Sequence, residues 1–414
     1  MSVTIPLKRN QMVFTTSSST IQLVLKVDSS KTVSDLVDFF SKSVACLHFR
    51  LKDENNLEYT KDKIYHYTIP SNITDLKDVS DYVGLNFTPD VKDSFGSIAT
   101  NEKNKLFVLN VSHRFSDGGF FKFLLDEFNK GEYPKETPIL PRFTNDIFSK
   151  EIKEALVITP PLNDKSIFRF NPNKLASPSP PATHCTHYDI KMKASEFKTY
   201  DPIKNTPRSI TDIMYLSLYF ASASYKEKLF DKFSVATVID LRTLLPYKPD
   251  FLSCYHCGHL YPTISNISPS DKLSSLSKRL KDDLSLKRKK DFHFSLIKSV
   301  PDMNSLSYGV GLCYSAVGVM TIKRPIVDAY VGILTNVSQH KSVTNTLDQI
   351  SLFNWSVKDE ERKKNDFTTQ LWYNQNIFDK DEIKLFGKRI EYFLKNVSLD
   401  ERIEDVYEII RKIK

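Results

Sequence analysis

The sequence has 414 residues, of which 40% are hydrophobic and 12% aromatic, which suits two ordinary cores and excludes a globally disordered chain. The formal net charge of +8 favours an anionic partner, but no arginine-rich arm or aromatic–glycine motif indicates nucleic acid. No run of 18 apolar residues and no signal-peptide core occur, so we expect no transmembrane segment. Five cysteines, a sparse and odd number, are typical of a reducing compartment. We therefore expect a soluble, cytoplasmic monomer.

The first half of the chain is predicted to alternate strands and helices. Alternating apolar residues over 21–27 predict a half-buried strand, and helical spacing over 33–44 predicts an amphipathic helix. A buried strand is expected at 106–111, followed by a helix with apolar residues over 120–128. The proline-rich stretch 157–181 interrupts these patterns and is typical of a linker.

The second half is predicted to contain further strands and helices. Strands are expected at 187–190, 235–240, 311–322, 329–334 and 368–373. Ser209 to Asp212 resembles a capping box, which predicts a helix from there to about Tyr225. Further helices are expected at 271–290 and, as the final element, over 383–393. This mixture predicts an α/β or α+β fold of layered helices and sheets.

The junction of the strand at 106–111 and its helix contains the most informative residues. His113 follows the strand, and Asp117 stands four residues later, just before Gly118 and Gly119. A histidine at the end of a buried strand can face a cleft, and the glycines allow another segment to approach closely. This arrangement suits a general base. Because two fixed positions also occur by chance in a chain with nine histidines, the interpretation depends on the flanking strand and helix.

Cysteine and histidine clusters offer another chemistry. One cluster comprises Cys254, His256, Cys257 and His259, and the other comprises His184, Cys185 and His187. Together they contain enough ligands for a zinc ion, and Cys-x-x-Cys spacing is also that of a redox pair. The first cluster follows a predicted strand as a loop, and the second lacks Cys-x-x-Cys spacing. We therefore expect neither a metal nor a redox site.

Several segments together resemble the CoA-dependent acyltransferase superfamily. Its members have a chloramphenicol-acetyltransferase-like fold and include BAHD acyltransferases, fungal alcohol acetyltransferases and condensation domains of peptide synthetases. In chain order, the segments are His48-Phe49-Arg50 after the first helix, the His-x-x-x-Asp-Gly motif from His113 to Gly118, the Asp-x-Arg strand ending Asp240-Leu241-Arg242, and the Ser-x-x-Gly strand containing Ser315 and Gly318. The resemblance therefore extends over most of the chain.

The sequence also departs from the family. Ser112 stands where condensation domains and chloramphenicol acetyltransferase have a second histidine. The BAHD motif Asp-Phe-Gly-Trp-Gly is absent, and Cys257-Gly258-His259 replaces the usual Gly-Asn after the Asp-x-Arg strand. These differences leave the subfamily open, with the alcohol acetyltransferase branch favoured.

The resemblance implies a role for each motif residue. His113 is the general base that acts directly on the acceptor, and Asp117 pairs with Arg242 to fix the loop. Ser315, or a backbone amide beside it, donates to the oxyanion. The expected catalytic positions are thus His113, Asp117 and Ser315, and the structural ones are Arg242 and Gly118. Two alternatives remain open, since Arg242 also fits an ordinary surface arginine and Ser315 a small core residue.

Acyl-CoA carries phosphates, so basic residues are expected at the mouth of its site. The densest basic run comprises Lys287, Arg288, Lys289 and Lys290, and a second candidate is Lys323 with Arg324. Such runs are also typical of a solvated face or a localisation signal.

The resemblance implies two chloramphenicol-acetyltransferase-like domains around a central active-site tunnel. We expect an N-terminal subdomain at 1–165, a crossover linker at 166–185 and a C-terminal subdomain at 186–414. The expected enzyme moves an acyl group, in the first place acetyl, from acyl-CoA as co-substrate to a small-molecule hydroxyl or amine, with no permanently bound cofactor. The alternatives are a catalytically silent binding protein on the same fold and a condensation-type enzyme fed by a carrier protein.

Overall fold

The computed structural model describes residues 2–6, 19–53, 55–60, 63–135, 141–157, 168, 170, 182–299, 311–336 and 350–414. Most of the predicted linker lies outside these residues. None of the helices in the described part of the chain is long and apolar enough to cross a membrane.

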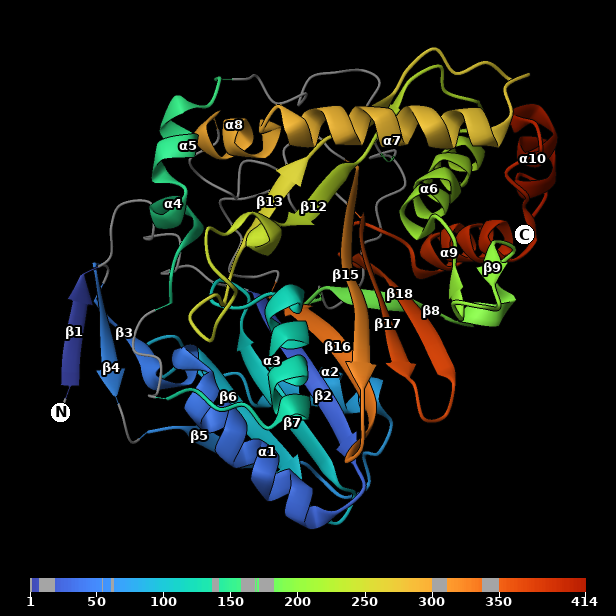
Figure 1. Cartoon of the computed structure of the whole chain (residues 1–414). Coiled ribbons are helices and arrows are strands. Elements are labelled where there is room, and N and C mark those ends of the chain that lie inside the picture. The colour runs from blue at the N-terminus through green and yellow to red at the C-terminus, as the bar shows by residue number, and fades with distance from the viewer. Residues whose placement is uncertain are drawn as a thin grey trace.

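The secondary structure mixes strands and helices throughout (Figure 1). The strands are β1 Ser2–Pro6, β2 Ser19–Val27, β3 Phe49–Asp53, β4 Asn56–Thr60, β5 Tyr65–Thr68, β6 Gly96–Asn101, β7 Leu106–Ser112, β8 Thr186–Lys193, β9 Tyr200–Asp201, β10 Thr206–Pro207, β11 Phe233–Ser234, β12 Ala236–Asp240, β13 Cys257–Leu260, β14 Thr263–Ile264, β15 Leu312–Ile322, β16 Ile326–Thr335, β17 Ile350–Asp359 and β18 Lys364–Tyr373. The α-helices are α1 Ser30–Ser43, α2 Leu76–Asn86, α3 Gly118–Lys130, α4 Thr144–Ile147, α5 Ser149–Glu154, α6 Ile210–Lys226, α7 Leu273–Lys289, α8 Phe292–Ser299, α9 Lys380–Asn396 and α10 Ile403–Ile410. Short 3-10 turns, η2 Ala45–His48, η4 Ala194–Glu196 and η5 Leu241–Leu244, connect some of them.

The first large sheet has the strand order β16-β2-β7-β6-β5. Helix α1 packs on one face, where Phe40 contacts Phe107 of β7. Helix α2 covers the other face, where Ser80 donates to Gln22 of β2. Because both faces are covered, β2 is almost entirely buried, and the half-buried strand predicted at 21–27 is wrong on this point.

The second large sheet has the order β13-β12-β15-β17-β18-β8. Helices α6 and α9 lie together against one of its faces, and Tyr215 of α6 contacts Tyr314 of β15 there. Residues of α6 from Asp212 to Ser224 are buried all round, as expected for a helix enclosed by a core. The opposite face is turned toward the first sheet, since Tyr330 of β16 contacts Trp355 of β17.

Strand β16 joins the two halves of the chain. It follows β15 in sequence but pairs antiparallel with β2 as an edge strand of the first sheet. A segment of the second half thus completes the first sheet, beside which α3 packs on β15 (Figure 1).

Other features of the structure also differ from the sequence-based expectations. The capping box at Ser209 is absent, because Ser209 has a left-handed backbone with φ 54° and its side chain makes no cap, whereas Asp212 is buried and accepts from Ser277 of α7 at 2.9 Å. Strand β17 was not predicted. The helix over 383–393 is α9, but α10 follows it, so α9 is not the final element.

Candidate active site

Strand β7 ends directly at His113. All seven residues of β7 are buried, and the backbone N–H of His113 donates to the Ser19 carbonyl of β2 at 3.0 Å. The sheet therefore fixes the position at which the histidine leaves the core.

The imidazole of His113 has a defined tautomer. Its Nδ1 lies 2.9 Å from the carbonyl oxygen of Ser116, which only accepts hydrogen bonds, so Nδ1 carries the proton. Nε2 then has its lone pair available, and the described residues place no hydrogen bond on it. Burial lowers the pKa of His113, although the Ser116 carbonyl and Asp117 oppose this effect. The neutral side chain with an available Nε2 is the form that a general base requires.

The carboxylate of Asp117 is directed away from this imidazole. Asp117 is the N-cap of α3, where its Oδ1 accepts from the Phe120 N–H at 2.9 Å. Its Oδ2 accepts from the backbone N–H of His256 at 2.9 Å. Within the described residues no hydrogen bond joins Asp117 to His113, so the carboxylate positions backbone segments.

Arg242 supplies the partner that the sequence predicts for Asp117. Its Nη2 lies 2.8 Å from Asp117 Oδ1, and both side chains are less than 10% exposed, so the predicted ion pair is confirmed. Arg242 also pairs with Asp240 at 3.0 Å and donates to the carbonyls of Ser253 and Cys254, each at 2.9 Å. Burial lowers the pKa of Arg242, but Asp117 and Asp240 raise it by more, so it stays charged. The buried guanidinium excludes the alternative of an ordinary surface arginine.

The two glycines of the motif lie where other segments approach. A Cβ at Gly118 would clash with the side chain of Val317 on β15. A Cβ at Gly119 would stand 2.6 Å from Nη1 of Arg242 and 2.7 Å from a carboxylate oxygen of Asp240. Gly118 and Gly119 therefore let the start of α3 approach β15 and the ion pair closely.

Ser315 lies on β15 close to this turn. Val317, which packs against Gly118, stands two residues after Ser315. The pairing of β15 with β17 shifts register between Ala316 and Gly318. Bulges of this kind re-aim side chains and are frequent beside functional sites. Ser315 is only partly buried.

The face of the second sheet opposite α6 lies beside the site. Val238 of β12 pairs with His259 on one side and Ser315 on the other, and paired residues share a face. All three remain partly accessible. Burial nevertheless lowers the pKa of His259 to about 4 and raises that of the neighbouring Cys257 to about 12. This part of the sheet is thus surrounded by protein without being sealed from solvent.

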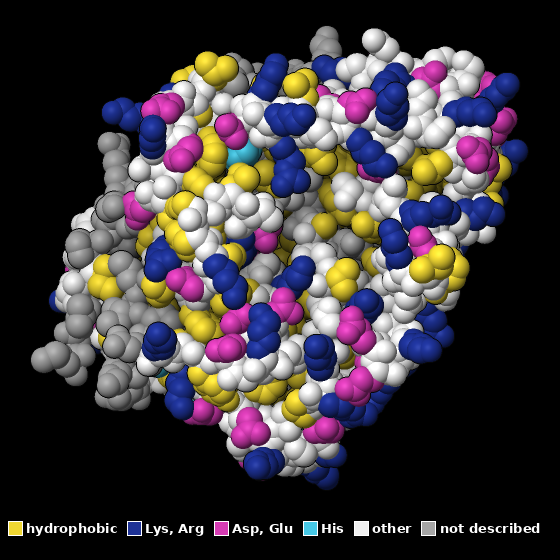
Figure 2. Space-filling view, in the orientation of Figure 1, with side chains coloured by type: hydrophobic (Ala, Val, Ile, Leu, Met, Phe, Trp, Pro, Cys, Tyr) yellow, Lys and Arg dark blue, Asp and Glu magenta, His cyan; other side chains and the backbone are white. Residues whose placement is uncertain are grey.

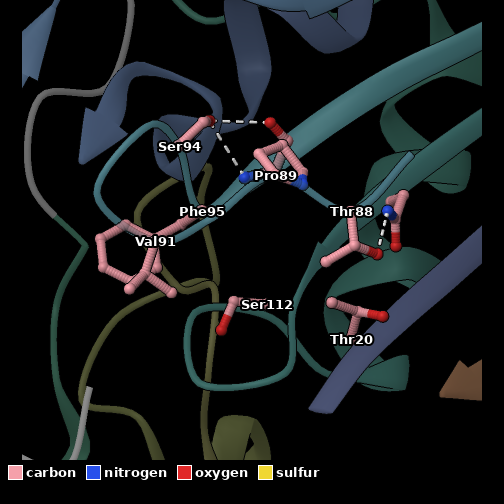
Figure 3. A pocket seen from close by; sticks show the side chains of 9 residues that line it. Thr20, Thr88, Pro89, Val91, Ser94, Phe95 and Ser112 are labelled. Carbon is pink, nitrogen blue, oxygen red and sulfur yellow. Dashed lines mark hydrogen bonds between the residues drawn. The ribbon is translucent and has the colours of Figure 1, made fainter. Parts of the chain in front are cut away.

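A small cavity adjoins the site on the first sheet. It has a volume of about 30 Å³, room for one or two water molecules. Figure 3 shows the lining side chains, which include those of Thr20, Thr88, Pro89, Val91, Ser94, Phe95 and Ser112. Ser112, the residue before His113, lies on its wall. A space of this size suits water and not a substrate.

The two groups of basic candidates lie at the end of α7 and in the turn after β15. Lys287, near the end of α7, is bound by Asp283 at 2.8 Å and by the Tyr261 carbonyl at 2.6 Å, whereas Arg288, Lys289 and Lys290 are exposed. Lys323 and Arg324 follow β15. Asn129 near the end of α3 donates to the carbonyl of Thr321, which puts this turn about 18 Å from the N-terminus of α3 at a rise of 1.5 Å per residue.

The cysteine and histidine clusters have other contacts. His256 Nδ1 hydrogen-bonds Thr144 at 3.0 Å, and Cys254 is buried in the core of the first sheet. His187 lies 3.4 Å from Asp189 and contacts Tyr330 across the seam between the sheets. Among the described residues no three His, Cys, Asp or Glu side chains are grouped as metal ligands.

The sequence did not single out three residues that shape the site. Ser116 fixes the tautomer of His113, Asp240 shares the guanidinium of Arg242, and Tyr255 contacts the imidazole with ring centroids 6.1 Å apart. Of the three, only Asp240 could have been identified from the sequence, because it is the first residue of the Asp-x-Arg pattern. Ser116 acts through its backbone, and Tyr255 is brought in by the tertiary fold.

Comparisons with known proteins identify the fold. No protein-family model matches the sequence, and no curated protein matches it significantly. The solved structure of polyketide synthase associated protein 5 from Mycobacterium tuberculosis is similar, with TM-score 0.60 and 10% identity over 95% of this chain and 98% of that one. The trichothecene 15-O-acetyltransferase of Fusarium sporotrichioides gives TM-score 0.57 and 12% identity over 95% and 96%. The starter condensation domain of rhizomide synthetase, a variant solved with C8-CoA and Leu-SNAC, gives 0.62 and 9% over 97% and 96%. The α/β fold predicted from the sequence is confirmed.

Proposed function

We propose that this chain, which has the fold of acetyltransferases and condensation domains, moves an acyl group from acyl-CoA to a hydroxyl or amine of a small molecule. The observation that carries the proposal is the environment of His113. Its Nδ1–H is fixed on the Ser116 carbonyl, and its neutral Nε2 is available to take a proton from an attacking nucleophile.

The surrounding residues fit the other needs of acyl transfer. The tetrahedral oxyanion needs a donor, and Ser315 on the irregular part of β15 is our candidate. Asp117, Arg242 and Gly118 hold the first turn of α3 in place and are positioning residues. Asp117 was expected among the catalytic positions, and its contacts support an indirect role.

The binding site of the acyl donor is proposed from the positions of basic side chains. The face in Figure 2 is hollowed between α7 and the N-terminal end of α3, and Lys and Arg side chains stand on the rim of the hollow together with acidic and hydrophobic ones. We assign the acyl-CoA phosphates to the exposed Arg288, Lys289 and Lys290 at the end of α7, with Lys323 and Arg324 as the second candidate. Binding of C8-CoA by the rhizomide synthetase variant supports a thioester of this kind as donor.

The test is release of free thiol from acetyl-CoA and C8-CoA in the presence of separate pools of alcohols and amines. His113→Gln is the matched control, and loss of the general base should lower the rate by about 10²- to 10⁴-fold. Acyl-CoA binding, followed by calorimetry, should persist in this variant.

The same assay separates the competing functions. A wild-type protein that binds acyl-CoA but releases no thiol with any acceptor pool is a binding protein. One that is active only with acyl groups on a carrier protein's phosphopantetheine is a condensation-type enzyme. Equal turnover by the wild type and His113→Gln would remove His113 from the mechanism.

A further inference from the structure

Tyr255 is the side chain that meets His113 from the second half of the chain. The two rings are in edge-to-face contact, with centroids 6.1 Å apart and an interplanar angle of 76°. Tyr255 lies in the loop that enters β13, 142 residues from the histidine in sequence, and neither motif contains it.

The loop holds Tyr255 on both sides of its backbone. Cys254, the preceding residue, has its carbonyl bound by Nη2 of Arg242 at 2.9 Å. His256, the following residue, donates its N–H to Asp117 at 2.9 Å. The same ion pair therefore anchors the two peptide groups that flank Tyr255.

The phenol of Tyr255 is anchored as well. Its hydroxyl interacts with the neighbouring side chain of Cys257, and burial raises the pKa of Tyr255, so the phenol stays neutral. Backbone and side chain together leave the ring little freedom beside the imidazole.

His113 needs such a neighbour. Within the described residues its side chain makes one hydrogen bond, from Nδ1 to the Ser116 carbonyl, and one bond leaves the ring free to rock about that contact. Proton transfer requires Nε2 to be held within hydrogen-bond reach of the nucleophile, and small misplacements lower the rate strongly.

We propose that Tyr255 is a positioning residue that holds the imidazole of His113 at its working angle and shields one side of it from water. Through Tyr255, the Asp117–Arg242 ion pair acts on a base that it does not touch. The catalytic consequence rests on the proposed acyl transfer, whereas the positioning is a property of the folded protein.

The test compares Tyr255→Ala with Tyr255→Phe in the full-length chain. Phenylalanine keeps the ring contact and loses only the hydroxyl, whereas alanine removes the ring. The readout is the NMR titration and tautomer of the His113 imidazole, assigned by comparison with His113→Gln. Tyr255→Leu, which fills part of the same space, serves if the alanine variant does not fold.

We expect Tyr255→Ala to raise the pKa of His113, because burial is the main cause of its low value. The charged groups that affect His113, Asp117 and Arg114, are unchanged in these variants. Tyr255→Phe should titrate like the wild type. In the acyl-transfer assay the alanine variant should lose about tenfold in kcat, with the KM for acyl-CoA within about twofold, as expected for lost orientation.

Unchanged titration and tautomer of His113 in Tyr255→Ala would overturn the proposal. An equal loss of kcat in the phenylalanine and alanine variants would also overturn it, because the hydroxyl and not the ring would then matter. A wild-type protein without transfer activity would refute the proposed function alone, since the titration still decides whether Tyr255 positions His113.

Discussion

The folded protein controls two properties of the His113 imidazole, its charge and its tautomer. A free histidine is partly protonated near neutrality, whereas burial here favours the neutral form and the Ser116 carbonyl places its proton on Nδ1. The protein therefore sets both the charge and the tautomer of the base before substrate arrives.

This predicts the acid side of the pH–rate profile. The rate should follow the neutral fraction of His113, and since its folded pKa lies below 6.5, activity should be full at pH 7 and fall only at lower pH. The profile of kcat/KM between pH 5 and pH 8 measures this. An acid limb centred above pH 7 would contradict it.

Asp117 and Arg242 form a buried pair whose partners depend on each other. Removing one charge leaves the other unpaired in the core, so Asp117→Ala and Arg242→Ala should each lower the free energy of unfolding by about 3–5 kcal/mol. The double variant should cost less than the sum of the two. Chemical denaturation measures all three.

The matched control for this cycle is the more exposed pair Arg50–Glu58. Its loss should cost only about 0–1 kcal/mol. Additive effects of Asp117→Ala and Arg242→Ala would show that the buried pair is not coupled.

At the scale of elements, strands and helices with regular apolar patterns were predicted. A strand whose buried polar residues find their partners only in the tertiary fold was not. The strand and helix around His113 were predicted because β7 is mostly apolar and α3 has helical spacing. Strand β17 was missed because buried polar residues break its pattern. One of them, Asn354, donates to Thr369 of β18 at 2.8 Å, a partner that only the fold supplies.

In the candidate site, too, some residues were predicted from the sequence and others were not. Its motif residues were predicted in sequence order, including the ion pair of Asp117 and Arg242. The loop carrying Tyr255 was interpreted from its cysteines and histidines, because its anchoring by Asp117 depends on residues 139 positions apart. The spacing of neighbouring residues in the sequence cannot predict such a contact.

The end of α7 is where we place the CoA phosphates. Changing Arg288, Lys289 and Lys290 to alanine should raise the KM for acyl-CoA roughly tenfold at low salt and leave kcat unchanged, because these contacts hold donor and transition state alike. Lys287 is left intact, since it bonds Asp283 and the Tyr261 carbonyl. Steady-state kinetics at two salt concentrations measure the effect.

The control is the pair Lys323→Ala and Arg324→Ala at the far end of α3. It should leave the KM near the wild-type value at both salt concentrations. The reverse result, in which only this pair raises the KM, would move the phosphates to the turn after β15.

At the scale of the whole molecule, the two sheets meet along a polar seam. Tyr330 of β16 donates to Asp189 of β8 at 3.0 Å, and Gln370 of β18 donates to Tyr330 at 2.5 Å. His187 lies beside them with its side chain only 4% exposed. We propose that this seam and β16 join the subdomains at 1–165 and 186–414, with 166–185 as the crossover between them.

Burial keeps several histidines neutral, so we expect the protein to lose stability in acid. Burial lowers the pKa values of His113, His187, His256, His259 and His293, among others. A lowered folded pKa means that the unfolded chain binds more protons below about pH 6.5, so stability must fall as the pH drops. For His256, with a pKa of about 4, this amounts to about 3 kcal/mol between pH 6.5 and pH 4.

Urea denaturation at intervals from pH 7.5 to pH 4 should therefore show a steady loss of unfolding free energy below about pH 6.5. His256→Asn should flatten this slope, because the His256 side chain bonds only Thr144 among the described residues and its N–H to Asp117 belongs to the backbone. His66→Asn, at a more exposed position, is the comparison and should flatten the slope less than His256→Asn, although partial burial lowers the pKa of His66 as well. If His256→Asn kept the full slope, the acid sensitivity would come from the other buried histidines, among them His187, where Asp189 and Asp81 face the imidazole.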